Sequence, residues 1–162
     1  MYKIVLTGGP CAGKTSALKG IKDYFTERGY QVFVVPETAT PLFMAGLSPE
    51  LVGIRQFQRN ILEIQAKIEE VFHEAAERFE KSIVVFDRGL ADGSAFCSGE
   101  EWAKILESSK TTEEIIFGRY DAVIHLESVA TTMPELYSNA TNEIRREDAK
   151  SAAENDELIK AS

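Results

Sequence analysis

A glycine-rich segment near the N-terminus carries the residue types that bind a polyphosphate chain. Gly8, Gly13, Lys14 and Thr15 follow the spacing Gly-x-x-x-x-Gly-Lys-Thr, between an apolar run and a helical pattern. Glycines let the main chain approach phosphate oxygens, and the N–H groups of such a loop and of the next helix converge on one anion. Lys14 would bring a positive charge to the β and γ phosphates, and the Thr15 hydroxyl would ligate magnesium. We therefore expect magnesium with ATP or GTP to be bound by a continuous set of residues: Gly8, Gly9, Pro10, Cys11, Ala12, Gly13, Lys14, Thr15 and Ser16.

Two acidic side chains follow apolar runs that we expect to be strands. Asp87 comes directly after residues 82–86, and Glu37 comes shortly after residues 31–35. The carboxyl ends of parallel strands meet at one crevice, so both should lie near the glycine-rich loop. Asp87 could hold magnesium through its water shell, or it could cap the next helix. Glu37 could accept a proton from an attacking hydroxyl, could join the magnesium shell, or could be a surface-loop residue. The predicted metal ligands are thus Thr15, Asp87 and Glu37.

Three arginines complete the candidate catalytic residues. Arg88 could contact phosphate or could pair with an acid. Arg145 and Arg146 are the only adjacent arginines, and they stand in an acidic region. On a lid they would neutralise charge on a phosphoryl group in transit, whereas on a solvated helix face they would form local ion pairs. The predicted catalytic residues are Lys14, Glu37, Asp87, Arg88, Arg145 and Arg146.

Five other side chains have both a functional and a structural interpretation. We expect Cys11 to be a small loop residue and not a nucleophile, because the sequence indicates no base beside it. Trp102 and His125 are expected to pack in the core. The amides of Gln58 and Gln65 could read the base or sugar of a substrate, or they could be exposed polar positions on a helix.

Short apolar runs alternate with helical patterns along the chain. Such alternation predicts an α/β fold, a three-layer αβα sandwich with a buried parallel sheet, of the P-loop NTPase kind. The expected strands are residues 2–6, 31–35, 82–86 and 120–126. The expected helices are residues 15–28, one long amphipathic helix from a cap at Ser48 to about Glu80, 100–107 and 112–117. No fifth strand follows, because residues 138–162 are polar and helix-prone; either the sheet has four parallel strands or the chain is shorter than a parent protein.

Length and charge limit the organisation and the partners. At 162 residues the chain has the size of one domain, and we expect residues 1–162 to form a single nucleotide-binding domain, with residues 139–162 as lid and C-terminal helix. The net charge is −8, with 12 acidic and 11 basic side chains in residues 1–99 against 14 and 7 in residues 100–162. Such a field repels nucleic acid, and we find no basic patch, so no nucleic-acid partner is expected.

Cysteine content and hydropathy indicate a cytoplasmic protein. Cys11 and Cys97 stand far apart and form no Cys-x-x-Cys pair, which suits a reducing compartment. No apolar run approaches the roughly 20 residues that span a bilayer. The N-terminal residues enter a strand pattern directly and lack the features of a secretory signal.

Four sequence blocks together resemble a known family. Residues 6–11, 34–40, 87–95 and 119–126 read LTGGPC, VVPETAT, DRGLADGSA and RYDAVIHL. From residue 3 to about residue 150 the chain resembles the ATP/GTP-binding domain of the TRPL translocation defect protein family, which is grouped with the kinase domain of the NAD-salvage regulator. The resemblance implies a nucleoside-kinase-like P-loop fold. Because eukaryotic relatives carry a further lipid- or phosphate-binding module, it also implies a possible protein or lipid partner.

The blocks at Glu37 and at Asp87–Arg88 also resemble those of deoxynucleoside and ribosylnicotinamide kinases. That resemblance implies that Glu37 serves as base. We therefore expect an ATP- or GTP-dependent phosphotransferase that acts on a small molecule with magnesium. The alternative is a regulatory NTPase or a nucleotide-gated adaptor in trafficking. A Ras-like mechanism is disfavoured, because the sequence has neither an Asn-Lys-x-Asp motif nor an Asp-x-x-Gly switch after the third strand.

Overall fold

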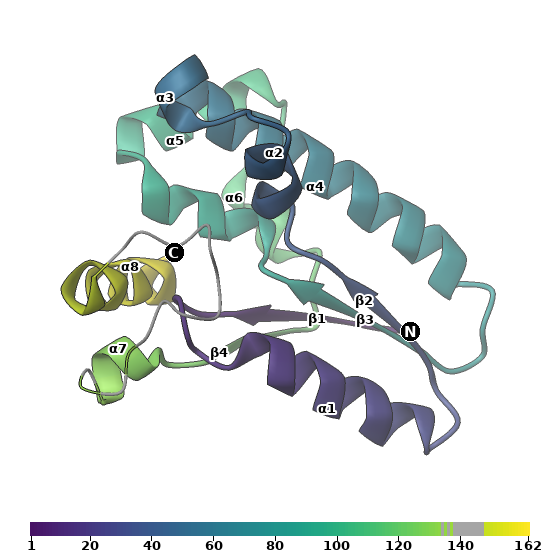
Figure 1. Ribbon diagram of the computed structural model, residues 1–162. Helices are drawn as coiled ribbons and strands as arrows, with labels where there is room; N and C mark the ends of the chain where they lie inside the picture. Colours follow the sequence, from purple (N-terminus) through teal and green to yellow (C-terminus); the bar gives the residue numbers. More distant parts are fainter. Residues whose placement is uncertain (134, 136, 138–147) are drawn as a thin grey trace.

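The sheet is parallel throughout, as the sequence predicts. The computed structural model describes residues 1–133, 135, 137 and 148–162 (Figure 1). Within these residues the strands form one sheet of order β2-β3-β1-β4, in which every neighbouring pair is parallel. The strands are β1 (Tyr2–Thr7), β2 (Gln31–Val35), β3 (Ser82–Asp87) and β4 (Ala122–His125). Because the strands are parallel, their carboxyl ends lie on the same side of the sheet, and the loops after β1, β2 and β3 are neighbours in space.

Helices cover both faces of this sheet. Figure 1 shows α1 along one face and α4 along the other, which gives the predicted three layers. The helices are α1 (Lys14–Thr26), α2 (Ala39–Met44), α3 (Pro49–Val52), α4 (Ile54–Ala76), α5 (Gly99–Ser108), α6 (Glu113–Phe117), α7 (Val129–Thr132) and α8 (Ala149–Ala161), with a 3-10 helix η1 (Leu90–Phe96). In the described part of the chain, no strand follows β4, and no helix is long and apolar enough to cross a membrane.

The packing of strand β3 explains why the sequence of a central strand is an unbroken run of apolar residues. Val84 and Phe86 pack on the α4 side, whereas Ile83 and Val85 pack on the α1 side. All four side chains are at most 1% exposed. A strand covered on both faces needs apolar residues at every position, which is the pattern of residues 82–86.

The long helix predicted from Ser48 to Glu80 is wrong in its first part. The chain forms α3, turns at Gly53 and restarts as α4. Gly53 has φ 82° and ψ 148°, a conformation that side-chain-bearing residues rarely adopt and that ends helical hydrogen bonding. The apolar stripe of this segment is only partly buried: Phe57 lies in the core, but Val71 is 54% exposed.

Strand β4 differs from the buried strand predicted over residues 120–126. It spans Ala122–His125 and forms an edge of the sheet, with Val123 58% and Ile124 42% exposed. The principal contacts of α1 and α4 are with β1, β2 and β3, so β4 lacks the two-sided cover of the central strands. Tyr120 precedes the strand, and its ring packs edge-on against Phe86. Apolar composition alone predicts burial of this strand, and it does not distinguish edge strands from central strands.

Candidate active site

The segment after β1 forms a tightly curved loop, here called the glycine loop (residues 8–15). Gly8, Cys11 and Gly13 have φ of 137°, 58° and 77°, and α1 begins directly after Gly13. A Cβ atom on Gly8 would lie 2.1 Å from the carbonyl oxygen of Leu126, so only glycine fits there. Cys11 is half-buried, and its positive φ helps the main chain to turn within the loop.

The mouth of the glycine loop suits an anion. Gly13 is the N-cap of α1 and has no side chain that could accept a hydrogen bond from the helix N–H groups, and the first turn of α1 carries no acidic residue. The positive end of the helix dipole therefore lies at the loop without a negative side chain in that turn. Thr15 and Ser16 are exposed there. The Lys14 Nζ atom lies 2.6 Å from the carbonyl oxygen of Gly8 and 2.9 Å from that of Gly9, which brings the ammonium group over the loop.

Arg88 joins the ends of β2 and β3 through acidic partners. Its Nε atom lies 2.8 Å from Glu37 Oε1, and its Nη1 atom lies 3.5 Å from Asp92 Oδ2. Asp92 also accepts a 2.5 Å hydrogen bond from the hydroxyl of Thr7, at the end of β1. Arg88 thus pairs with acids, which is one of the two roles open for it. Thr40 donates a hydrogen bond to the second oxygen of Glu37 at 3.0 Å, so the carboxylate has a fixed orientation.

Asp87 has an unsatisfied oxygen in the middle of this cluster. Its Oδ1 atom is buried and has no hydrogen-bond partner among the described residues. Burial raises the pKa of Asp87, and the nearby charge of Lys14 offsets only part of this effect. Capping of the next helix, the alternative role for Asp87, belongs to Asp92, which accepts a hydrogen bond from the Gly89 N–H group at 3.3 Å. A buried carboxylate oxygen without a donor is costly, which suits a position that faces a cation or its water.

The pKa of Glu37 is shifted in the opposite direction from that of Asp87. Burial, the largest single influence, would raise the pKa of its carboxyl group. The charge of Arg88 and the hydrogen bonds from Thr40 and Arg88 together outweigh burial and hold the pKa below its ordinary value. Glu37 is therefore ionised at neutral pH, as a proton acceptor must be.

The donor set fits magnesium only together with phosphate. Thr15 offers an exposed hydroxyl, and Asp87 offers the unpartnered oxygen described above. In the described ranges, no three His, Cys, Asp or Glu side chains gather closely enough to hold a metal by themselves. Magnesium commonly keeps several waters and takes oxygen ligands from substrate phosphates, so such a partial protein shell is sufficient.

A cavity of about 340 Å³ adjoins the glycine loop; we call it the α4 cavity. Pro10 of the loop lines it, together with Glu37 and Arg88. Three phenylalanines are among its lining residues, and the rings of two of them, Phe43 and Phe57, pack with centroids 4.9 Å apart. A largely apolar cavity with a few directed polar groups is typical of a small-molecule site.

The two glutamines of α4 that the sequence singles out, Gln58 and Gln65, differ in what they contact. Both are buried, Gln58 at 5% and Gln65 at 3% exposed, so the interpretation as exposed helix positions is wrong. Gln65 accepts a hydrogen bond from Thr38 and donates one to the carbonyl oxygen of Arg88 at 3.1 Å. Gln58 lines the α4 cavity, and its amide makes no hydrogen bond to any described residue. Gln65 thus supports the left-handed backbone of Arg88, which has φ 76°. Both glutamines line the cavity, and they differ in that the Gln65 amide is already engaged by these partners.

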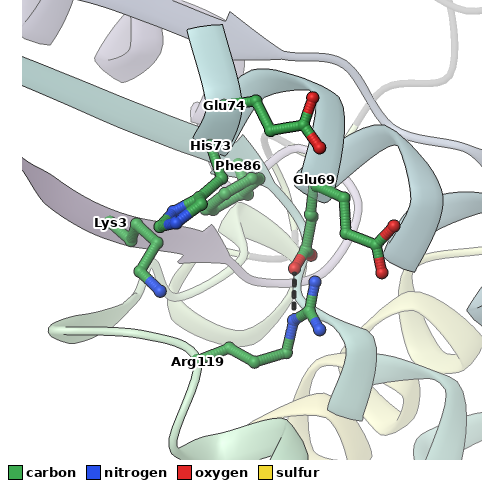
Figure 2. A pocket seen from close by; sticks show the side chains of 7 residues that line it. Lys3, Glu69, His73, Glu74, Phe86 and Arg119 are labelled. Carbon is green, nitrogen blue, oxygen red and sulfur yellow. Dashed lines mark hydrogen bonds and ion pairs between the residues drawn. The ribbon is translucent and has the colours of Figure 1, made fainter. Parts of the chain in front are cut away.

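A second cavity, of about 260 Å³, is lined by Lys3, Phe86, Arg119 and residues of α4, and by none of the glycine loop (Figure 2). Its buried acid, Glu69, accepts hydrogen bonds from Arg119 Nε at 2.9 Å and from the Tyr120 hydroxyl at 2.8 Å. Burial raises the pKa of Glu69 despite these donors. None of the predicted site residues lines this cavity, so the candidate active site is the α4 cavity together with the glycine loop.

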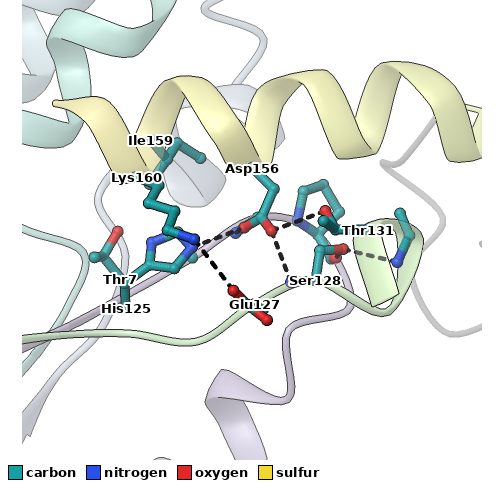
Figure 3. A network of polar contacts seen from close by, with 12 residues as sticks. Thr7, His125, Glu127, Ser128, Thr131, Asp156, Ile159 and Lys160 are labelled. Atoms are coloured by element: carbon teal, nitrogen blue, oxygen red, sulfur yellow. Dashed lines mark hydrogen bonds and ion pairs between the residues drawn. The ribbon is translucent and has the colours of Figure 1, made fainter. Parts of the chain in front are cut away.

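The remaining predicted residues have different outcomes. Arg145 and Arg146 lie outside the described residues, as does the predicted lid up to residue 147. Trp102 is 5% exposed and packs in the core, as expected. His125 is half-buried but not purely a core residue, because its Nε2 atom lies 3.2 Å from Asp156 Oδ1 (Figure 3).

Sequence reasoning missed three groups that organise the site: Thr7, Asp92 and Asp156. Asp92 stands four residues after Arg88, a helical spacing that brings opposite charges together, so a signal existed. Asp156 had no such signal, since it stands in a polar stretch that reads as solvent-exposed helix. In the structure it is 1% exposed.

Comparisons with known proteins give the kind of fold and the family. A search of curated proteins returns no match. Among solved structures, the chain is similar to deoxyadenosine kinase from M. mycoides with bound dATP, at 16% identity and a TM-score of 0.53, over 99% of this chain and 83% of that one. It also matches an APS kinase mutant from Mycobacterium tuberculosis, at 14% identity and a TM-score of 0.39, over 78% and 76%. The first likeness shows a P-loop kinase-like fold. Residues 3–162 match the AAA domain family, and the chain belongs to that family.

Proposed function

We propose that this protein is a magnesium-dependent kinase that transfers the γ-phosphoryl group of ATP or GTP to a hydroxyl group of a small molecule. The observation that carries the proposal is the α4 cavity, which adjoins the glycine loop and has Glu37 in its wall. A kinase needs a closed acceptor site next to its phosphate site, with a base inside it. A nucleotide-gated adaptor needs no such cavity.

The glycine loop and the carboxyl end of β3 would hold the nucleotide. The first N–H groups of α1 and the ammonium group of Lys14 would bind the β and γ phosphates. Thr15 and Asp87 would hold magnesium, with Glu37 as a further candidate, and the bound ion would neutralise charge on the β and γ phosphates. Arg145 and Arg146 stay in the proposal as groups that neutralise the transferred phosphoryl.

The acceptor would react beside Glu37. Its hydroxyl oxygen forms a bond to the γ phosphorus while the bond from that phosphorus to the β–γ bridging oxygen breaks, and the hydroxyl proton passes to Glu37. Arg88 orients the Glu37 carboxylate through the 2.8 Å ion pair, and Asp92 holds the other side of Arg88. Pre-oriented groups of this kind need little rearrangement during the reaction.

The walls of the α4 cavity favour a planar acceptor with hydrogen-bonding edges, such as a nucleoside. The deoxyadenosine in the name of the similar kinase is a molecule of that kind. Gln58→Leu removes the cavity-facing amide at similar volume. We expect it to raise KM for the acceptor about tenfold, the effect of one lost hydrogen bond, and to leave nucleotide affinity unchanged. Steady-state kinetics with the acceptor varied at saturating nucleotide measures this, and an unchanged KM would remove Gln58 from acceptor binding.

A thermal-shift panel of ATP, GTP, CTP and UTP with magnesium tests the proposal. A nucleotide at 100 times its dissociation constant should stabilise the fold by roughly 2.7 kcal/mol. An acceptor screen with the best binder follows, in which phosphorylated product supports the kinase. If no nucleotide stabilises the protein, the proposal fails.

Hydrolysis without any phosphorylated acceptor, together with nucleotide-dependent binding of a protein or lipid partner, would instead favour the regulatory NTPase or trafficking adaptor. The narrower likeness to the TRPL translocation defect proteins stays a prediction.

A further inference from the structure

One buried carboxylate ties the C-terminal helix α8 to the glycine loop. The Oδ1 atom of Asp156 accepts a 2.7 Å hydrogen bond from the Gly9 N–H group (Figure 3). Its Oδ2 atom accepts hydrogen bonds from the Ser128 N–H group at 2.8 Å and from the Thr131 hydroxyl at 3.0 Å. The side chain thus joins α8, the glycine loop and the start of α7.

The fit around this carboxylate is close. A Cβ atom on Gly9 would lie 2.8 Å from the Cβ atom of Asp156, so the helix and the loop touch without intervening space. The Ser128 hydroxyl donates a hydrogen bond to the carbonyl oxygen of Pro10, which fixes the loop one residue further on. Asp156 therefore holds the loop directly at Gly9 and indirectly at Pro10.

The chemistry of the contact requires a carboxylate. Two main-chain N–H groups and one hydroxyl donate to it, and His125 Nε2 lies 3.2 Å away. An apolar side chain could dock α8, but it would leave the N–H groups of Gly9 and Ser128 buried without these acceptors. The contact therefore satisfies main-chain N–H groups of Gly9 and Ser128 in addition to attaching α8.

The Gly8–Gly9 peptide connects Asp156 to Lys14. The N–H group of this peptide donates to Asp156, and its carbonyl oxygen lies 2.6 Å from Lys14 Nζ. A peptide unit is planar, so fixing its N–H direction also fixes its carbonyl direction. Asp156 thereby determines which way the carbonyl that contacts the Lys14 ammonium group points.

We propose that Asp156 is a positioning residue for phosphoryl transfer, which acts through the Gly8–Gly9 peptide to keep the glycine loop and Lys14 arranged for a nucleotide polyphosphate. The inference rests on the proposed function. Without Asp156 the peptide can rotate, and the ammonium group loses a fixed contact. Nucleotide affinity should then fall although no residue that touches nucleotide has changed.

The test compares Asp156→Ala and Asp156→Asn with the control Asp148→Ala, using magnesium-ADP and isothermal titration at a temperature at which all variants are folded. Asp148 caps the same helix by accepting a 2.8 Å hydrogen bond from the Ser151 N–H group, so its loss weakens α8 without touching the loop. We expect D156A to weaken magnesium-ADP binding about tenfold, as for a lost hydrogen bond to a charged group, and D148A to leave it unchanged. D156N keeps one acceptor oxygen and should lie between wild type and D156A; if D156A does not fold, D156N carries the test.

A double-mutant cycle separates positioning from a general loss of packing. If Asp156 acts through Lys14, adding D156A to Lys14→Ala should weaken binding much less than D156A does in the wild type. Full additivity of the two losses, or equal affinity of D156A and D148A, would overturn the inference. A failure of the proposed function is recognisable separately, since then the wild-type protein would not bind magnesium-ADP or K14A alone would leave its affinity unchanged.

Discussion

Replacing Lys14 with alanine should lower kcat/KM for phosphoryl transfer by about a thousandfold. Removal of one pre-oriented donor to developing charge commonly costs 10² to 10³ in rate, and Lys14 is also the cation that the glycine loop would hold over the β and γ phosphates. Nucleotide binding should fall with turnover, because the charge acts on the ground state too. Initial rates with the acceptor found by screening, and titration with magnesium-ATP or magnesium-GTP, measure the two effects.

Lys19→Ala is the matched control for this variant. Lys19 is an exposed residue on the same helix, α1, and its replacement removes the same charge further along the helix from the loop. Long-range electrostatics alone would affect the two variants similarly, whereas a direct phosphate contact affects K14A only. Tight nucleotide binding by K14A would count against the glycine loop as a phosphate site.

The position of the candidate site could be predicted from the sequence because it depends on topology. A motif of fixed spacing defines the glycine loop, and the rule that parallel strands end at one edge brings Glu37 and Asp87 to it. Neither inference requires knowledge of side-chain packing. The structure accordingly has both carboxylates near Lys14, whose charge acts on each of them.

The partners of the charged groups could not be predicted in the same way. Arg88 pairs with Glu37, 51 positions away, and Asp156 bonds to Gly9, 147 positions away. No local pattern specifies such contacts, because they depend on how distant elements pack. Gln65 shows the same limit, since a polar residue on a helix reads as exposed until its buried partners are known.

Errors in the elements also have specific physical causes. One glycine with positive φ, Gly53, divides the segment that the sequence predicts as a single helix. A periodic pattern of apolar residues carries no information about the backbone angle at one position. Strand β4 is apolar but lies at the sheet edge, and edge position follows from strand order, which composition does not contain. Both errors fall outside the glycine loop, so they leave the inference about the site intact.

Glu37→Gln should lower kcat by roughly 10² to 10⁴, the usual contribution of a general base, and leave magnesium-nucleotide affinity nearly unchanged. Glutamine keeps the size of the side chain but cannot take up the hydroxyl proton. If the proposed activity is correct, the wild-type protein should lose it as the pH falls through the pKa of Glu37, which the charge of Arg88 and the hydrogen bonds from Thr40 and Arg88 hold below the ordinary value. The acidic limb of the kcat profile should therefore lie below the usual range for glutamate and be absent in the variant.

The control is Glu70→Gln. Glu70 also pairs with a cation, Lys67, at 2.8 Å, but on the exposed surface of α4. It undergoes the same chemical change as E37Q and should leave kcat and its pH profile unaltered. Equal rates for E37Q and wild type would remove Glu37 from the role of base. A loss of nucleotide affinity in E37Q with kcat retained would instead assign the carboxylate to the magnesium shell, the other role that its place beside Arg88 and the glycine loop allows.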